Sequence, residues 1–153
     1  MQNLISKAKP YIISVLIALA VGGLSALLTM GNMDIYDQII KPSFAPPGIV
    51  FPIVWAILYV LMGISSARIY IKGGNLFYYT IQLILNFFWS IIFFNLNAFL
   101  LAFVWLVILW IFILLMIVSF FRTDKLAAYL QIPYLLWVTF AGWLTLMVYM
   151  LNG

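Results

Sequence analysis

Long apolar stretches separated by short polar breaks dominate this chain of 153 residues. The longest uncharged run covers residues 73–121. At 1.5 Å per residue, one helix from Leu76 to Phe121 would be about 69 Å long, whereas the hydrocarbon core of a bilayer is about 30 Å thick. The chain must therefore turn within this run, and the polar pair Asn95 and Asn97 marks the place. The pattern predicts a hairpin of two transmembrane helices.

Three other apolar stretches, at residues 11–30, 49–67 and 126–151, have about the 20 residues that one crossing requires. We therefore predict an all-α membrane protein with a five-transmembrane-helix bundle. Its helices are expected at about residues 11–30, 47–70, 76–95, 98–121 and 126–151. These leave no stretch for a second domain, so residues 1–153 are predicted to form one domain. The composition agrees, because only 7% of the residues are charged, against about 25% in soluble domains.

Lysine and arginine are distributed unequally between the two sides of such a bundle. The side with the N-terminus and the second and fourth loops carries Lys7, Lys9, Arg68, Lys72, Arg122 and Lys125. The other side carries only Lys41. Because cytoplasmic loops retain cations, we predict a multi-pass protein of the cell membrane with its N-terminus cytoplasmic and its C-terminus outside. The net charge of +4 then fits anionic lipid headgroups, and no nucleic-acid partner is predicted.

The chain lacks the residues on which most enzymatic sites depend. It has no His, Cys or Glu, which excludes the usual general base, thiol nucleophile and zinc or haem-iron ligands. Its three carboxylates, Asp34, Asp37 and Asp124, lie in predicted loops, with Asp124 on the opposite side of the membrane from the other two. We therefore predict no metal site and no catalytic residue.

Polar and aromatic residues recur at helical spacing in three of the predicted helices. The stripe on the third helix contains Gln82, Asn86, Trp89, Ser90 and Phe93. The stripes on the second and fifth helices contain Phe51, Trp55, Tyr59 and Met62, and Tyr134, Trp137, Ala141 and Thr145. Such stripes could line a ligand pocket, which typically has apolar walls and few polar groups. They could equally join neighbouring helices or mark the membrane interface, and spacing alone does not decide between the two.

The first helix and the loop after it have features of their own. Ala18, Gly22 and Ala26 recur at every fourth position, a spacing that lets another helix approach closely and predicts a packing face. Residues 41–48 contain three prolines and a glycine. Because proline fixes its backbone angle, this loop is predicted to be stiff and could cover the outer end of the bundle. The alternative is a rigid connector that starts the second helix with Pro47 in its first turn.

Three blocks of residues, taken in order, resemble the TspO family of tryptophan-rich sensory proteins, which are related to the translocator protein. The first block covers residues 36–48, followed by Pro52 and Trp55. The second contains Gln82, Asn86, Trp89, Ser90, Phe93 and Phe94, and the third contains Pro133, Tyr134, Trp137, Phe140, Ala141 and Asn152. The resemblance covers the full length of the chain.

This resemblance implies a five-helix bundle, commonly a homodimer, with a pocket open toward the first loop. It implies a tetrapyrrole ligand such as protoporphyrin IX and no obligatory cofactor, and some members bind cholesterol or synthetic ligands. Trp55 and Asn86 would be polar contacts to the ligand, and Lys41 could meet a propionate. The rest of the pocket would be lined by Tyr36, Pro46, Phe51, Tyr59, Trp89, Ser90, Phe93, Trp137 and Ala141.

Three functions are compatible with these expectations. The first is a membrane receptor or sensor that binds a porphyrin-type tetrapyrrole. The second, proposed for relatives, is light- and oxygen-dependent breakdown of the bound porphyrin, with Trp55 and Trp137 as redox partners. The third is transport of tetrapyrroles or lipids, which is the least favoured because the chain has no internal repeat of the kind found in many transporters.

Overall fold

The computed structural model describes residues 2–32 and 34–152, which form helices and loops without a strand. Five helical segments within these residues are long and apolar enough to cross a membrane. They are α1 (Gln2–Thr29), α3 (Val50–Ile71), α4 (Phe77–Ser90) continued by the π-helix η2 (Ile91–Asn95), α5 (Phe99–Thr123), and the short α6 (Lys125–Leu130) continued by α7 (Ile132–Asn152). The predicted all-α fold with five transmembrane helices is confirmed. A 3-10 helix, η1 (Met30–Asn32), and the short α2 (Ile35–Gln38) follow α1.

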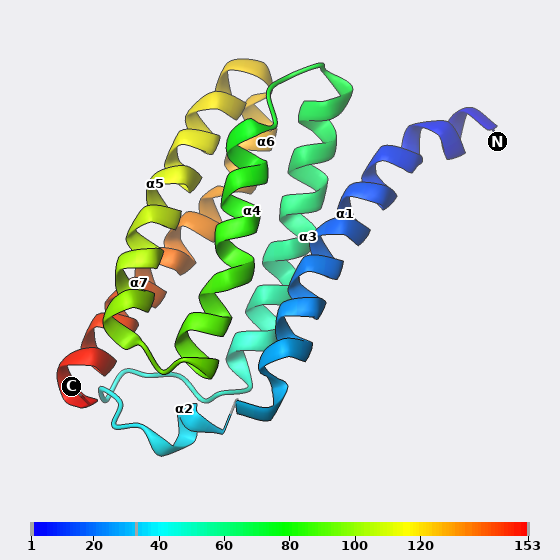
Figure 1. Ribbon diagram of the computed structural model, residues 1–153. Helices are drawn as coiled ribbons and strands as arrows, with labels where there is room; N and C mark the ends of the chain where they lie inside the picture. The colour runs from blue at the N-terminus through cyan, green and yellow to red at the C-terminus, as the bar shows by residue number, and fades with distance from the viewer. Residues whose placement is uncertain (1, 33, 153) are drawn as a thin grey trace.

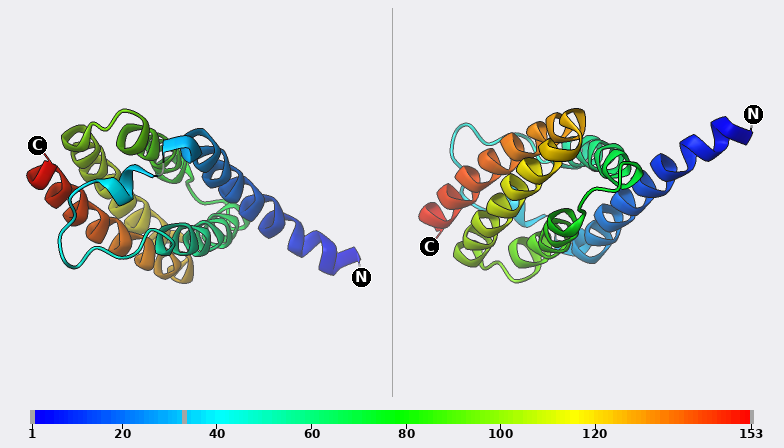
Figure 2. Two further views of the ribbon diagram at one scale, coloured as in Figure 1. Left: turned by 90° about the horizontal axis from the view of Figure 1, so that it is seen from below. Right: turned by 90° about the horizontal axis from the view of Figure 1, so that it is seen from above.

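The helices form a closed ring when the bundle is seen along its axis (Figure 2). α1 packs between α3 and α4, α5 packs between α4 and α7, and α6 contacts α3. The N-terminal half of α1 projects away from the other helices (Figure 1). Its apolar side chains there, including Leu4, Ile5 and Leu16, are exposed, as expected of a surface that faces lipid.

Three asparagines fasten one end of the bundle, here called the loop end, which holds η1, α2, residues 39–49, residues 95–98 and the C-terminal turn of α7. Asn32 Nδ2 donates to Asn95 Oδ1 at 2.7 Å. The Asn152 side chain accepts from the Ile40 N–H at 3.0 Å and donates to the Ile40 carbonyl at 2.8 Å. The proline-rich loop is therefore tied to the end of α7, and α2 with this loop lies across the ring (Figure 2, left).

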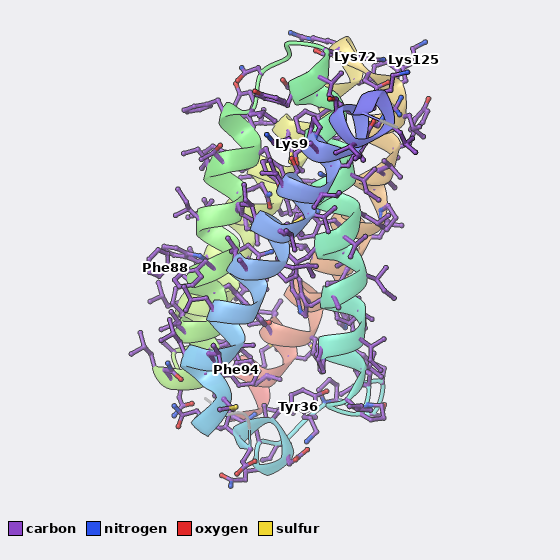
Figure 3. All side chains as sticks on the ribbon, turned by 90° about the vertical axis from the view of Figure 1, so that its right-hand side faces the viewer. Lys9, Tyr36, Lys72, Phe88, Phe94 and Lys125 are labelled. Atoms are coloured by element: carbon purple, nitrogen blue, oxygen red, sulfur yellow. The ribbon has the colours of Figure 1, made fainter. Side chains whose placement is uncertain are left out.

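The opposite end, here called the basic end, carries the turns between α3 and α4 and between α5 and α6. Lys72 and Lys125 lie there, far from Tyr36 at the loop end (Figure 3). Asp124 is buried and accepts hydrogen bonds from the Arg68 guanidinium and, at 3.1 Å, from Lys72 Nζ. The Arg68 guanidinium and then the Lys72 ammonium lower the pKa of the Asp124 carboxyl to about 2. This ion cluster joins the end of α3 to the start of α6.

Several helix bounds differ from those expected, and proline explains two of the differences. α1 begins at Gln2 rather than near residue 11 and continues through Pro10. α3 begins at Val50 rather than at residue 47, which places Pro52 in the first turn, where its missing N–H has no partner to lose. The fifth crossing breaks at Gln131, because Pro133 cannot donate to the carbonyl four residues earlier.

The turn between the third and fourth crossings lies at residues 96–98 and uses Asn97 with a φ of 51°. Asparagine tolerates this left-handed conformation better than most residues. Before the turn, the last residues of the third crossing form the π-helix rather than an α-helix, with the Leu96 N–H bonded to the Ile91 carbonyl at 3.1 Å. The sequence pattern gave no sign of this wider turn.

Candidate ligand cavity

A cavity of about 460 Å³ occupies the half of the bundle next to the loop end. It is bounded by α1, α3, α4 with η2, α7 and the segment that contains α2. Its volume lies within the range of about 300–1,000 Å³ that is typical of small-molecule pockets. The bundle therefore encloses a space that an organic ligand of moderate size can enter.

The first wall is an aromatic row on α3. Phe51, Trp55 and Tyr59 line the cavity at successive turns of the helix, and the ring centroids of Trp55 and Tyr59 are 5.8 Å apart. Trp137 of α7 supports this row from behind, with its ring 5.7 Å from that of Phe51 and 6.5 Å from that of Trp55. Phe51, Trp55 and Tyr59 thus form an aromatic wall of the cavity on α3.

The second wall is formed by α4 and η2. Trp89 and Phe93 stack with centroids 5.4 Å apart, and Phe93 lies 4.9 Å from Phe94. In a regular α-helix Phe94 would be turned by about 140° from Trp89. The wider π-turn brings Phe94 back to the same side, where it lines the cavity with Trp89, Ser90 and Phe93. One extra residue in the turn thus adds an aromatic ring to the wall, and π-turns are frequent at functional sites.

The third wall, on α1, consists of small residues. Gly22, Ser25, Ala26 and Thr29 line the cavity. A methyl group at Gly22 would overlap the ring of Tyr59, so glycine is required for α1 to approach α3 here. The hydroxyls are occupied within the protein, since Thr29 donates to the Ser25 carbonyl at 3.0 Å and Ser25 to a carbonyl of α4 at 3.1 Å. The wall is therefore weakly polar despite its composition.

Ala141, Leu144 and Thr145 of α7 complete the lining between the aromatic walls. The Thr145 hydroxyl donates to the Ala141 carbonyl at 2.7 Å and is buried. This side of the cavity is therefore also apolar toward a ligand. The small side chain of Ala141 leaves space that a larger residue would fill.

The loop end of the cavity is covered by the segment around α2, where Tyr36 is labelled in Figure 3. Burial and the neighbouring Asp37 raise the pKa of the Tyr36 hydroxyl, which donates to the Pro46 carbonyl at 2.6 Å. Lys41 Nζ donates to the Tyr36 carbonyl at 2.6 Å and lies 4.8 Å from the centre of its ring. Asp34 and Asp37 line the cavity here, and both are exposed. The charged groups at this end of the lining are therefore carboxylates.

A buried chain of hydrogen bonds lies behind the α3 row. The Tyr59 hydroxyl donates to Asn86 Oδ1 at 2.6 Å, and Asn86 Nδ2 donates to the Tyr134 hydroxyl at 2.7 Å. Tyr134 in turn donates to Gln82 Oε1 at 2.7 Å. Three crossings are joined by neutral polar groups, which is the role of helix-joining residues in membranes. Of these four hydrogen-bonded side chains, only that of Tyr59 also lines the cavity.

The structure brings eight of the predicted site residues together in the lining: Tyr36, Phe51, Trp55, Tyr59, Trp89, Ser90, Phe93 and Ala141. The other four, Pro46, Lys41, Asn86 and Trp137, are not part of it. Pro46 and Lys41 hold Tyr36 in place, Trp137 supports Phe51 and Trp55, and Asn86 is buried behind Tyr59. Asn86 therefore joins α4 to α3 and α7, and it also positions the cavity residue Tyr59.

Sequence reasoning missed the α1 wall as part of the lining. The spacing of small residues predicted a packing face, and Ala18 and Gly22 do pack against other helices. Gly22 also lines the cavity, as do Ser25, Ala26 and Thr29 further along the same face. The hydroxyls of Ser25 and Thr29 gave no distinguishing signal, because serine and threonine are also common in packing faces between membrane helices.

Comparison with known proteins extends these observations. The sequence matches the TspO/MBR family over residues 14–151. It is similar to the "Tryptophan-rich protein TspO" of Chlorobaculum tepidum, with 40% identity over 124 residues that cover 76% of this chain and 78% of that protein. The protein of the same name from Archaeoglobus fulgidus is 36% identical over 149 residues, covering 92% and 95%. The "Tryptophan-rich sensory protein" of Cereibacter sphaeroides is 34% identical over 120 residues, covering 76% of each chain.

Proposed function

The chain belongs to the TspO/MBR family of membrane proteins, and we propose that it is a sensor whose cavity binds a porphyrin-type tetrapyrrole such as protoporphyrin IX. The observation that carries this proposal is the cavity of about 460 Å³ with aromatic walls on two sides. Flat conjugated molecules stack on such rings in offset or edge-to-face arrangements. Such walls suit a flat conjugated ligand better than a single flexible lipid chain, which offers no ring to stack.

The lining also supplies a hydrogen-bond donor that the protein itself does not use. Trp89 is buried, lines the cavity, and its indole Nε1 has no partner among the described residues. This nitrogen is not exposed to the cavity, so a ligand reaches it only if the Trp89 ring turns; because a buried polar group without a partner is costly, a ligand that then accepts this hydrogen bond gains affinity. Pyrrole nitrogens and peripheral carbonyls of a tetrapyrrole are suitable acceptors. Asn86 contributes through Tyr59, whose hydroxyl it fixes.

Charge at the loop end constrains how such a ligand would be oriented. Asp34 and Asp37 line the cavity, whereas the ammonium group of Lys41 is held by the Tyr36 carbonyl and ring. We propose that the propionates of a porphyrin meet water beyond these carboxylates rather than an ion pair with Lys41. By the positive-inside rule, we also propose that the basic end faces the cytoplasm and the cavity opens toward the outside.

Titration of the purified protein in detergent with protoporphyrin IX in the dark, followed by tryptophan fluorescence, tests binding. Two variants address the site: Ala141→Leu, which fills the cavity, and Trp55→Phe, which removes an indole from its wall. Gly142→Ala, at a position where an added methyl group meets nothing within 4 Å, is the matched control on the same helix. We expect saturable quenching in the wild type and the control, and an affinity at least tenfold weaker in Ala141→Leu. Equal affinity in all variants would place the ligand elsewhere and refute the proposed site.

Light-dependent breakdown of the porphyrin is a different hypothesis, and the dark titration separates it from binding. The loaded protein is then illuminated in the presence of oxygen, and absorbance spectra are compared with those of free porphyrin and of the Trp55→Phe variant. A product formed only by the wild-type protein would favour an enzymatic activity. Identical spectra from free and bound porphyrin would leave the protein as a binding protein in this assay.

A further inference from the structure

A second hollow, here called the outer groove, lies between α3 and α7 and has a volume of about 410 Å³. Its lining is entirely apolar and consists of Val54, Ile57, Leu58 and Leu61 of α3, and Pro133, Leu136, Trp137 and Phe140 of α7. Ile57 is 56% exposed and Leu136 is 65% exposed, so the groove is open on the outside of the bundle. Both helices belong to segments that can cross a membrane. The outer groove therefore opens toward the hydrocarbon of the bilayer.

The outer groove and the candidate cavity are formed by neighbouring residues of the same two helices. On α3, Trp55 lines the cavity and the preceding residue, Val54, lines the groove. On α7, Ala141 lines the cavity and Trp137, one turn earlier on the same helix face, lines the groove. α3 packs most closely with α1 and α6, and α7 with α5. Side chains rather than closely packed backbones therefore separate the two spaces between α3 and α7.

Trp137 is the side chain that connects the two spaces. It lines the outer groove. Its ring centroid lies 5.7 Å from that of Phe51 and 6.5 Å from that of Trp55, and both of these residues line the cavity. The Trp137 ring thus has the groove on one side and the aromatic wall of the cavity on the other.

No hydrogen bond holds the Trp137 ring in place. Its indole Nε1 has no partner among residues 2–32 and 34–152. Two other tryptophans that pack between helices differ in this respect: Trp105 Nε1 donates to the Leu85 carbonyl at 2.7 Å, and Trp110 Nε1 donates to Thr139 Oγ1 at 2.8 Å. Because Trp137 is held by packing alone, its ring can turn without the loss of a hydrogen bond.

From this geometry we propose that the outer groove is a docking site for flat hydrophobic molecules dissolved in the bilayer, and that the Trp137 ring is the gate through which they pass into the cavity. Such molecules concentrate in the bilayer, because their apolar surface is removed from water there. The groove offers them the rings of Trp137 and Phe140, whose centroids are 5.5 Å apart, and flat conjugated molecules stack on such rings. This entry route is separate from the loop end and does not depend on which ligand the cavity takes.

Labelling of a single cysteine inside the cavity tests this route without a porphyrin. The chain contains no cysteine, so Ser90→Cys places one thiol on the α4 wall of the cavity. The full-length protein is placed in lipid nanodiscs, and pyrenyl maleimide, a flat hydrophobic reagent, is supplied within the lipid. A small water-soluble maleimide is applied in a parallel experiment and reports access from the loop end. Because neither reagent is a tetrapyrrole, failure of this route and failure of porphyrin binding are measured separately.

Two tryptophan substitutions on α3 form a matched pair in the Ser90→Cys background. Ile57→Trp fills the outer groove from the lipid side, whereas Ile53 is equally exposed, at 56%, and lines neither the groove nor the cavity. We expect Ile57→Trp to slow labelling by pyrenyl maleimide about tenfold, because only molecules whose groove admits the reagent can react. Labelling by the water-soluble maleimide should be unchanged, and Ile53→Trp should change neither rate. Trp137→Ala, which removes the gate, should accelerate labelling by pyrenyl maleimide.

Three results would overturn the proposal. Equal rates of labelling by pyrenyl maleimide in Ile57→Trp and Ile53→Trp would leave the outer groove as a surface covered by lipid chains. No labelling by pyrenyl maleimide, with or without Trp137→Ala, would show that a molecule in the bilayer does not reach the cavity. Equal slowing of both reagents in Ile57→Trp would indicate a distorted cavity rather than a closed route.

Discussion

Replacing Tyr134 by phenylalanine removes the central hydroxyl of the chain behind the cavity and keeps the ring. The ring contact with Trp55, at 6.1 Å between centroids, is retained. Asn86 Nδ2 loses its acceptor and Gln82 Oε1 loses its donor, and both side chains are buried. An orphaned buried group costs about 1–3 kcal/mol in soluble proteins, whereas hydrogen bonds between membrane helices average about 0.6 kcal/mol. With two groups orphaned, we expect a loss of about 2 kcal/mol in the free energy of unfolding.

Reversible unfolding in mixed micelles of mild detergent and SDS, followed by circular dichroism, measures this loss. Tyr149→Phe on the same helix is the matched control, because the Tyr149 side chain is only half-buried. A double-mutant cycle with Gln82→Leu should give a coupling energy of about 0.5–1.5 kcal/mol between residues 82 and 134. If Tyr134→Phe were no less stable than Tyr149→Phe, the chain would contribute nothing measurable, and our account of the stripe as a helix-joining element would fail.

Three further predictions concern the two ends of the bundle. The double substitution Asp34→Asn and Asp37→Asn should strengthen binding of protoporphyrin IX about two- to tenfold, because it removes the repulsion between these carboxylates and the propionates. The gain in affinity should shrink at high salt. Unchanged affinity in the dark titration would argue against our orientation of the ligand. The pKa of Asp124 is lowered in the folded state, so its stabilising contribution, about 1 kcal/mol after solvent screening, is present above pH 4 and is lost as the pH falls through about 2. Asp124→Asn should abolish that part of the pH dependence in acid unfolding curves, and an unchanged curve would show that the ion cluster is not stabilising. Because the chain contains no cysteine, the single substitutions Ser43→Cys and Asn75→Cys can report the orientation of the protein in the membrane. An impermeant maleimide applied to whole cells should label residue 43 and not residue 75. The reverse labelling would contradict our proposed topology.

The fold was largely predictable because hydrophobicity and length act locally along a membrane chain. Five apolar stretches of sufficient length specify five crossings, whatever their side chains contact. The details that escaped prediction depend on backbone hydrogen bonding at single residues. Pro133 breaks the last crossing near Gln131 although the apolar pattern continues, while Pro10 does not end α1. A proline signals a lost hydrogen bond, but the packing around it decides whether the helix stops.

The aromatic part of the cavity could be predicted because Trp55 and Trp89 belong to stripes with helical periodicity. The remainder depends on three-dimensional relations that periodicity does not contain. The spacing of Asn86 identified it correctly as facing inward, but not that Tyr59 would stand between it and the cavity. Phe94 is out of phase with Trp89 in an α-helix and lines the cavity only because of the π-turn.

The fastening of the proline-rich loop to α7 sets how quickly a ligand can enter from that end. Two hydrogen bonds join Asn152 to Ile40, and at about 1 kcal/mol each they hold the loop closed by a factor of about 30. A ligand that must wait for opening then meets a competent protein only about 3% of the time, and its association rate constant falls by the same factor. Provided that the same hydrogen bonds close the loop over the empty and the loaded cavity, Asn152→Ala would accelerate association and dissociation together and leave the equilibrium affinity nearly unchanged. Asn152 does not line the cavity, so we expect its contact with the loop to govern residence time rather than recognition.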